Sequence, residues 1–340
     1  MFFDGQKTDY FVDDAEWRRF DAGMRRLLRD RRFVASFCRR AKSFLEKKGA
    51  TIGRACRRDY SCLSDAQVAR AFSAIRADVD AFYTRMWMVF LLGEPLAQAV
   101  HTLLLARVPQ NADEWVRDFA SPLEPNDAVN ARISLLRIAA SPVSGRASLL
   151  TRHARRFSHL SVFDVGQPRL SSAHFFGELS RIKQAGAELA HIRAGFSARR
   201  RVFRSRLHAL TLSPNGLEHA LVRMLSDAVF LRDYRDSLRL NMNVALRHLY
   251  AEIGRRLGLS VSDVTLLSDA EITDALLGRL SRKRLSFWVR ERRSAFLFRL
   301  DGEKAFVASG ARAKRQSRSL YARQKTAAFV HGRCGSPGTA

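Results

Sequence analysis

The stretch of sequence that most constrains the fold runs over residues 213–258. Ser213 and Pro214 provide an N-cap and a first-turn proline, and Gly258 provides a C-terminal stop after a pair of arginines. A helix of about 42 residues extends about 63 Å at 1.5 Å per residue, so its apolar face needs other helices along it. We therefore predict an elongated multi-helix bundle built around this long helix. Its apolar residues recur at steps of three and four: Leu217, Leu221, Met224, Ala228, Leu231, Leu238, Met242, Ala245, Leu249, Ile253 and Leu257.

Further amphipathic segments supply the expected partner helices. Ser64 with Gln67, and Ser268 with Glu271, have the spacing of capping boxes. One helix is expected to stop at Gly49, and the aperiodic segment 157–168 is expected to be a loop that crosses back over the bundle. Helices are expected over residues 17–28, 33–49, 68–93, 95–108, 126–138, 146–156, 171–212 and 268–278.

The residue pattern changes in the C-terminal part of the chain. The pair Asp301-Gly302 predicts a hairpin turn, with Phe306 and Val307 in the returning strand, while residues 282–298 fit either a helix or a strand. The predicted fold class is thus mainly α with a small β element near the C-terminus. We expect residues 1–280 to form the helical bundle and residues 281–325 to form a basic connector that contains the hairpin.

The charge of the chain raises the question of a polyanionic partner. Lys and Arg number 59 against 33 Asp and Glu, a formal net charge of +26, which would attract nucleic acid. The alternative is that solvated arginines are simply spread along every helix. The concentrated basic run 311–325 lacks the interleaved aromatic residues of a single-strand binding platform.

Familiar catalytic and metal-binding motifs do not stand out in the sequence. It contains no GxGxxG, GxxxxGK[ST] or GxSxG pattern, and its four cysteines have neither CxxC spacing nor a disulfide framework. His153 and His159 are six residues apart, which does not place them on one helical face. Asp233 and Asp236 stand among arginines at the spacing of ordinary helical ion pairs. No catalytic, cofactor-binding or metal-binding residue is predicted.

The compartment is expected to be the cytoplasm. The opening residues are acidic and mixed, unlike a secretory signal. The stretch 86–106 is free of Lys and Arg, but it contains Glu94, Pro95, Gln98 and His101. We expect two core helices that meet at Gly93, Glu94 and Pro95, and no membrane span.

Three segments carry a resemblance to a known family. The sequence LRDYRDSLRLNMNVALRHLYAEIGRRLGL, followed by SDVTLLSDAEI, resembles phosphoenolpyruvate synthase-like enzymes, a group that includes rifampicin phosphotransferase. In that family a long helix ends in a phrase of the type "eigrrLgl" and leads to "eDvfyLtpeEi". Residues 118–140 resemble the loop and helix before the family's "ygw" region. The terminal AAFVHGRCGSPGTA resembles the entry to its swivelling phosphohistidine domain. The resemblance covers residues 10–340.

The resemblance implies a role in phosphoryl transfer. In the family, an ATP-grasp domain and a phosphoenolpyruvate- or substrate-binding domain exchange a phosphoryl group through a histidine on the swivelling domain. Residues 326–340 would be the truncated start of that domain, and no residue matches the T-x-H histidine, a role that we do not assign to His331.

The expected function is therefore a helical spacer or scaffold of a phosphotransferase that lacks its own catalytic histidine. Its partners would be ATP-grasp, phosphohistidine or phosphoenolpyruvate-binding modules encoded elsewhere, and ATP and Mg would belong to those modules. The alternative function is a basic helical protein that binds nucleic acid or another polyanion. A helical enzyme with an unrecognised site is a third alternative, and no constellation of residues favours it.

Overall fold

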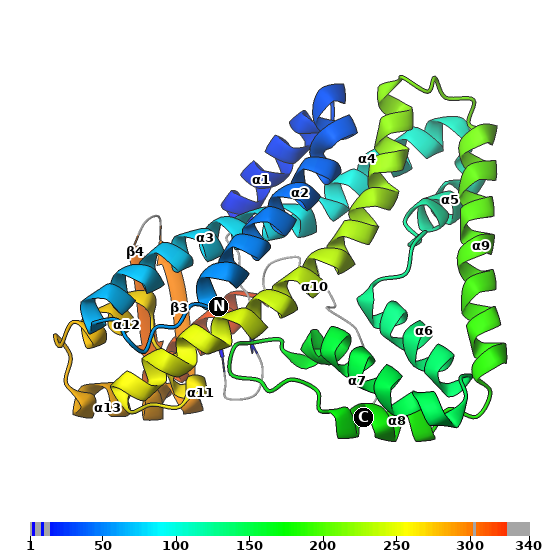
Figure 1. The fold of residues 1–340 in the computed structure, drawn as a ribbon. Coiled ribbons are helices and arrows are strands. Elements are labelled where there is room, and N and C mark those ends of the chain that lie inside the picture. Colours follow the sequence, from blue (N-terminus) through cyan, green and yellow to red (C-terminus); the bar gives the residue numbers. More distant parts are fainter. Residues whose placement is uncertain (1, 4–7, 10–13, 302–303, 325–340) are drawn as a thin grey trace.

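The computed structural model describes residues 2–3, 8–9, 14–301 and 304–324. The predicted architecture is confirmed: the protein is mainly α, is built around one long helix and carries a small antiparallel sheet that includes the C-terminal hairpin (Figure 1). The segment 326–340, expected to begin a swivelling domain, lies outside the described residues.

The long helix α10 spans Leu217–Leu257 and crosses the molecule diagonally in Figure 1. Its start was predicted too early, because the chain turns over residues 213–216, where the Gly216 amide donates to the Ser213 carbonyl at 2.8 Å. Its end was predicted correctly. Gly258 adopts a left-handed conformation with φ of 70°, and its amide donates to the carbonyl of Gly254.

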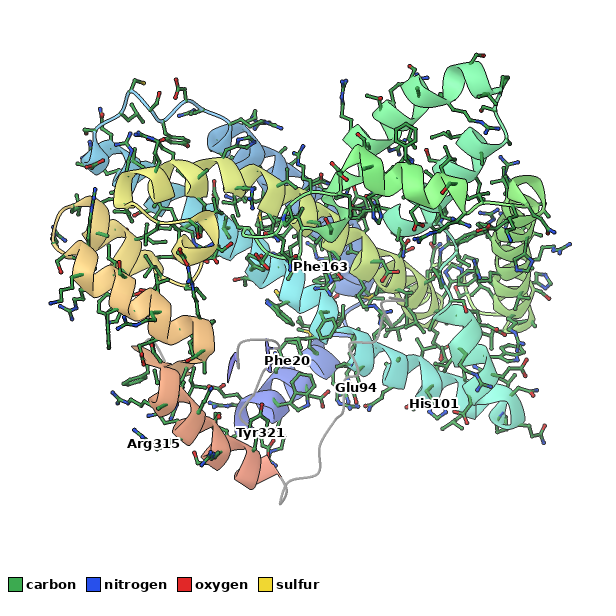
Figure 2. The ribbon with its side chains drawn as sticks, turned by 90° about the horizontal axis from the view of Figure 1, so that it is seen from below. Phe20, Glu94, His101, Phe163, Arg315 and Tyr321 are labelled. Atoms are coloured by element: carbon green, nitrogen blue, oxygen red, sulfur yellow. The ribbon has the colours of Figure 1, made fainter. Side chains whose placement is uncertain are left out.

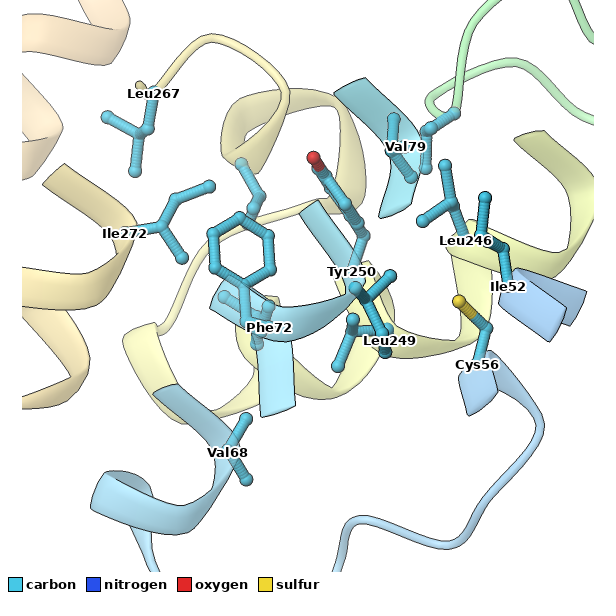
Figure 3. Packing of buried hydrophobic residues seen from close by; sticks show 14 of the residues in the cluster. Ile52, Cys56, Val68, Phe72, Val79, Leu246, Leu249, Tyr250, Leu267 and Ile272 are labelled. Carbon is cyan, nitrogen blue, oxygen red and sulfur yellow. The ribbon is translucent and has the colours of Figure 1, made fainter. Parts of the chain in front are cut away.

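Two hydrophobic cores cover the two halves of α10. The first core lies around its C-terminal half, where Phe72, Leu249 and Ile272 are fully buried (Figure 3). The second core lies around its N-terminal half and includes Leu96 and Val222. The helices that contribute to these cores beside α10 are α1 (Asp14–Leu27), α2 (Arg31–Cys56), α3 (Asp65–Leu91), α4 (Gly93–Arg107), α5 (Ala112–Phe119), α9 (Ala185–Ala209, through Phe203), α11 (Val261–Val264), α12 (Asp269–Leu276) and α13 (Arg282–Ser294).

The helix α2 continues where the sequence predicted a stop. It runs past Gly49 to Cys56, and Leu45, Ile52 and Cys56 are fully buried in the first core. A glycine inside a helix costs about 1 kcal/mol relative to alanine, whereas complete burial of one large aliphatic side chain contributes about 2 kcal/mol. Tertiary packing therefore outweighs the local preference for a helix end.

The helices α3 and α4 follow each other almost end to end, with Leu92 between them. The two expected helices are thus present, but they meet at Leu92, and residues 93–95 form the first turn of α4. By length and composition the combined segment Asp65–Arg107 could cross a membrane, and 33% of its most apolar window is buried inside the protein. Its buried residues face the two cores: α3 contributes to both, and α4 contributes Leu96, Val100 and Leu104 to the second. The buried part of this segment thus packs into the two cores.

A third group of helices lies beside α10 and has its own small core around Leu150, Phe157 and Phe175. The single helix expected over residues 171–212 is divided in two, because α8 packs Phe175 against this core while α9 leaves it and runs toward α5 (Figure 1). The helices of this group are α6 (Asp127–Ala139), α7 (Arg146–Phe157), α8 (Ser172–Ser180) and α9 (Ala185–Ala209).

The small sheet has the strand order β2-β1-β3-β4, and each neighbouring pair is antiparallel. The predicted hairpin is confirmed, with Asp301 opposite Lys304. The pairing of an N-terminal strand with β3 was not predicted. A further helix, α14 (Gly310–Gln324), packs on the hairpin through Ala313. The strands are β1 (Phe2–Phe3), β2 (Thr8–Asp9), β3 (Phe296–Asp301) and β4 (Lys304–Ser309).

Two ion pairs, one of them buried, hold α13 against α11 and α12. Arg292, which is 4% exposed, donates to both carboxylate oxygens of Glu271 at 2.6 and 2.7 Å and to the Leu266 carbonyl at 2.8 Å. The adjacent Arg293 pairs with Asp263 at 2.6 Å. Glu271 also closes the predicted capping box with Ser268. One carboxylate thus caps α12 and anchors α13.

The end of α10 generates a stability prediction. A Cβ at Gly254 would lie 2.5 Å from the Leu259 carbonyl oxygen, a backbone atom that returns over the helix end. We expect Gly254→Ala to lower the free energy of unfolding in urea by about 2 kcal/mol through overpacking. The matched change Gly195→Ala in α9 meets nothing within 4 Å and should stabilise by up to about 1 kcal/mol. Equal effects of the two changes would contradict this explanation.

Candidate functional site

The candidate site is a cavity of about 550 Å³ between α6, α7 and α9. Its position follows from the third group of helices, in which α6 packs against both α7 and α9. The residues at positions 130, 133, 134 and 137 face it from one side of α6, at the helical spacing of three and four. The residues that line it are Pro125, Asn130, Ile133, Ser134, Arg137, Arg156, Phe157, Ile192, Arg193, Phe196, Ser197 and Arg200.

The charges in this lining are all positive. Four arginines contribute, Arg137 from α6, Arg156 from α7, and Arg193 and Arg200 from α9, and the lining contains no carboxylate. Among the residues described by the structure, none of the four forms an ion pair with Asp or Glu. Arg200 instead donates to the Leu123 carbonyl at 3.3 Å. The cavity is therefore an electropositive site without an internal counter-charge.

Several arginines elsewhere in the fold are paired with carboxylates. Arg206 on the same helix α9 contacts Glu114 at 2.6 Å and Asp118 at 2.5 Å. Arg256 on α10 contacts Asp65 and Glu252 at 2.6 and 2.7 Å. The arginines of the cavity thus differ from these paired arginines in their surroundings.

Cross-links between helices fix the walls of the cavity. Arg132 donates to both oxygens of Glu188 at 2.6 and 2.7 Å and so joins α6 to α9. His153 Nδ1 lies 3.0 Å from the hydroxyl of Ser134, which joins α7 to α6. These links leave the guanidinium groups on a preformed frame, the arrangement that favours tight binding of a small ligand.

A buried polar cluster joins this group of helices to α10. The Ser237 hydroxyl donates to the Asp127 carboxylate and lies 3.3 Å from His159 Nε2. The same residue types make up a hydrolytic triad, but in such a triad the histidine lies between the acid and the serine. Here the serine lies between the other two and donates to the carboxylate. Since Ser237 and His159 are 5% and 6% exposed, the cluster acts as a structural tether.

The segment predicted as a loop after α7 is a loop only in part, because Phe157 ends α7 and a 3-10 helix spans Ser158–Ser161. Side chains of α10 hold the part that follows in place. Asn243 donates to the carbonyls of Val162 and Phe163 at 3.0 and 2.9 Å, and Arg239 donates to the Phe163 carbonyl at 2.8 Å. Phe163 is labelled in Figure 2. Arg247 reaches the carbonyls of residues 165 and 166 at 2.9 and 2.8 Å. Several polar side chains of α10 are therefore used to satisfy backbone groups of the loop.

The ion pairs predicted on α10 are present in part. Arg239 lies 3.6 Å from Asp236 at the predicted i,i+3 spacing, whereas the contact of Arg232 with Asp233 at 3.8 Å joins adjacent residues and was not predicted. The buried Arg235 has an additional role, because its guanidinium donates to the Met86 carbonyl at 3.2 Å and so links α10 to α3.

The buried thiols have the character of core residues. Burial raises the pKa of Cys38 and of Cys56 to about 12 each, so both thiols are protonated at neutral pH. Cys62 is exposed. No group of three or more His, Cys, Asp or Glu side chains within the described part of the chain is arranged to hold a metal ion.

The cavity was not predicted from the sequence. Its four arginines come from three helices, and each arginine follows the same pattern as the many others on helical surfaces. The sequence signal nearest to it was the helix expected over residues 146–156, which supplies Arg156. The four arginines converge because α9 packs beside α6. The single helix expected over residues 171–212 did not predict this packing.

Comparison with known proteins gives no assignment. No family model, no curated protein and no solved structure matches this chain.

The buried histidines predict a dependence of stability on pH. Burial lowers the pKa of both His153 and His159; Arg156 adds to the effect at His153 and Arg169 at His159, where Asp127 opposes it. The unfolded chain therefore takes up protons first as the pH falls through about 6.5, and stability should decrease until the pH lies below the folded-state pKa values. Urea unfolding at about pH 8, 7, 6 and 5 measures this loss.

Variants distinguish the buried histidines from the rest of the chain. The change His159→Gln keeps a hydrogen-bonding group and should reduce the loss of stability between about pH 7 and pH 5. The change at an exposed histidine, His191→Gln, should leave the pH dependence as it is. An unaltered pH dependence in His159→Gln would be evidence against this origin.

Proposed function

We propose that this chain is a helical connecting module of a phosphoenolpyruvate synthase-like phosphotransferase, without phosphotransfer chemistry of its own. The observation that carries the proposal is the structure of the segment at the end of α10, which resembles that family. The end of α10, the Gly254 and Gly258 turn, and the helices α11 and α12 pack into one core. Capping boxes at Ser260 and Ser268 begin the two short helices. The "eigrrLgl" and "eDvfyLtpeEi" phrases thus correspond to a compact structural unit.

The roles of the buried ionisable groups support a scaffold. Arg235 and Arg292 bind backbone carbonyls or a carboxylate of another helix, and Asp263 caps α11 while it binds Arg293. These contacts hold helices together. A module of this kind would serve in the cytoplasm, with ATP and Mg bound by partner domains of the ATP-grasp, phosphohistidine or phosphoenolpyruvate-binding type.

A reconstitution assay tests this function. The chain alone should transfer no phosphoryl group from ATP or phosphoenolpyruvate, because the proposed catalytic histidine is supplied by a partner. Addition of an ATP-grasp or phosphohistidine protein encoded beside this chain should yield phosphorylated protein, detected with radiolabelled ATP. An unrelated protein of similar positive charge, added in place of the chain, controls for nonspecific attraction. Phosphotransfer by the isolated chain, or equal transfer with the control protein, would refute the proposal.

The second candidate function is binding of nucleic acid or another polyanion. The specific observation in its favour is the net charge of +26 together with arginines that have no carboxylate partner. For this function we expect the affinity for a DNA duplex to fall steeply with salt, with a slope of about 0.9 per phosphate neutralised. Fluorescence anisotropy over a range of salt concentrations measures the slope, and a flat titration would exclude this candidate.

A further inference from the structure

The excess positive charge of the chain is concentrated in two segments. Residues 126–209, which include α6 to α9, contain 15 Lys and Arg against 4 Asp and Glu. Residues 279–325, which include α13, the hairpin and α14, contain 15 against 3. All other residues together contain 29 against 26. The long-helix bundle is thus nearly balanced in charge, and a polyanion is attracted to these two parts of the fold.

In the second segment, the helix α13 presents an aromatic ring between two cations. Lys283, Phe287 and Arg290 follow each other at steps of four and three residues, which places them on one side of the helix. All three are exposed, and Phe287 is 49% exposed. The other side of α13 carries Leu285 and Val289, which are buried in the first core. The side with the ring and the cations is therefore the outer face of α13.

The charged groups of this outer face are not neutralised by carboxylates of the protein. Among the residues that the structure describes, neither Lys283 nor Arg290 forms an ion pair with Asp or Glu. Glu291, the one carboxylate of α13, is directed toward Gly310 at the start of α14. The guanidinium of Arg290 lies 5.6 Å from the centre of the Phe287 ring, so a cation and an exposed ring stand side by side.

The outer face of α13 is fixed in the fold. The ion pairs of Arg292 and Arg293 join α13 to α12 and α11, so the exposed ring stands on a helix that is anchored from its other side. The helix α14 packs against α13 and adds more cations to this part of the surface. These are Lys314, Arg315 and Arg318, which are exposed. A ligand would therefore meet a prearranged ring with positive charge around it.

This combination fits a single strand better than other polyanions. Proteins that bind single strands place cations along the backbone and aromatic side chains against unpaired bases. In a duplex the bases are already paired and stacked, so a ring on the protein surface has no free base to cover. An interfacial membrane helix inserts a continuous apolar face. On α13 the apolar residues Leu285 and Val289 face the core, and Phe287 lies alone between cations.

We propose that the outer face of α13 binds single-stranded nucleic acid. One unpaired base stacks on Phe287, Lys283 and Arg290 contact the phosphates on either side of it, and the cations of α14 contact phosphates further along the strand. The inference rests on the second candidate function, binding of a polyanion, and specifies the site and the ligand. Because the contacts are with the backbone and with the flat face of a base, binding tolerates different base sequences.

Fluorescence anisotropy with the full chain tests the role of the ring. The probes are a labelled oligothymidylate and a labelled DNA duplex of the same length. We expect Phe287→Ala to weaken binding of the single strand at least about fivefold and to leave binding of the duplex unchanged. Phe287→Trp keeps an aromatic face and should keep the affinity. Circular dichroism melting of each variant verifies the fold.

A second exposed ring provides the matched control. Phe176 is 51% exposed on α8, a helix that contains no Lys or Arg. Phe176→Ala should therefore leave binding of the oligothymidylate unchanged. If Phe287→Ala and Phe176→Ala weaken the single strand alike, or if Phe287→Ala weakens single strand and duplex alike, the proposed stacking is wrong.

The salt dependence tests the cations. The double change of Lys283→Gln and Arg290→Gln should lower the salt slope for the oligothymidylate by about 1.4, because each phosphate neutralised on a single strand contributes about 0.7. The matched double change of Arg201→Gln and Arg204→Gln removes two exposed charges from α9, in the other basic segment, and should leave the slope unchanged. Equal reductions would indicate general attraction by the net charge and would overturn the assignment to α13.

The outcomes separate this inference from the candidate function on which it rests. If the chain binds neither probe, both are wrong. If it binds single strand and duplex alike and Phe287→Ala changes neither, the inference is wrong and polyanion binding stands. Sedimentation with vesicles of equal parts phosphatidylcholine and phosphatidylserine tests the membrane as partner. Vesicle binding that Phe287→Ala abolishes would assign the outer face of α13 to a lipid surface and overturn the inference.

Discussion

The fold depends on burial of the apolar face of α10, a helix that is not stable without other helices packed against it. A single exposed helix of 41 residues would have a continuous apolar stripe in water, and most helical stability in proteins comes from packing of such a face. In this protein α10 contributes Val222 and Leu225 to one core and Leu249 and Ile253 to another. The other helices of these cores therefore pack along both halves of α10.

Arginine has two separate uses in the structure. Within the bundle it fills positions where two helices or a helix and a loop leave carbonyl groups without partners, as Arg247 and Arg292 do. The planar guanidinium suits this role because its several donors reach different acceptors at once. In the group of helices α6 to α9, four arginines instead face a shared cavity. The many arginines of the chain therefore do not all have the same role.

Local structural features were predicted well from the sequence, whereas long-range packing was predicted poorly. The end of α10 at Gly258, the capping boxes at Ser64 and Ser268, and the hairpin followed from residue types within a few positions of each other. The continuation of α2 past Gly49 did not, because buried side chains override the preference of a single glycine. The cavity escaped prediction for a similar reason: its residues span positions 125–200, and only tertiary packing brings them together.

The passage of α10 through both cores has a consequence for how the protein loses its structure. Neither core contains a complete set of helices without its half of α10, and α2 runs beside much of the same rod. Melting of one end removes the neighbour on which the other end is stacked. We therefore expect the two cores to unfold as one cooperative unit over the length of α10, although their interiors are separate.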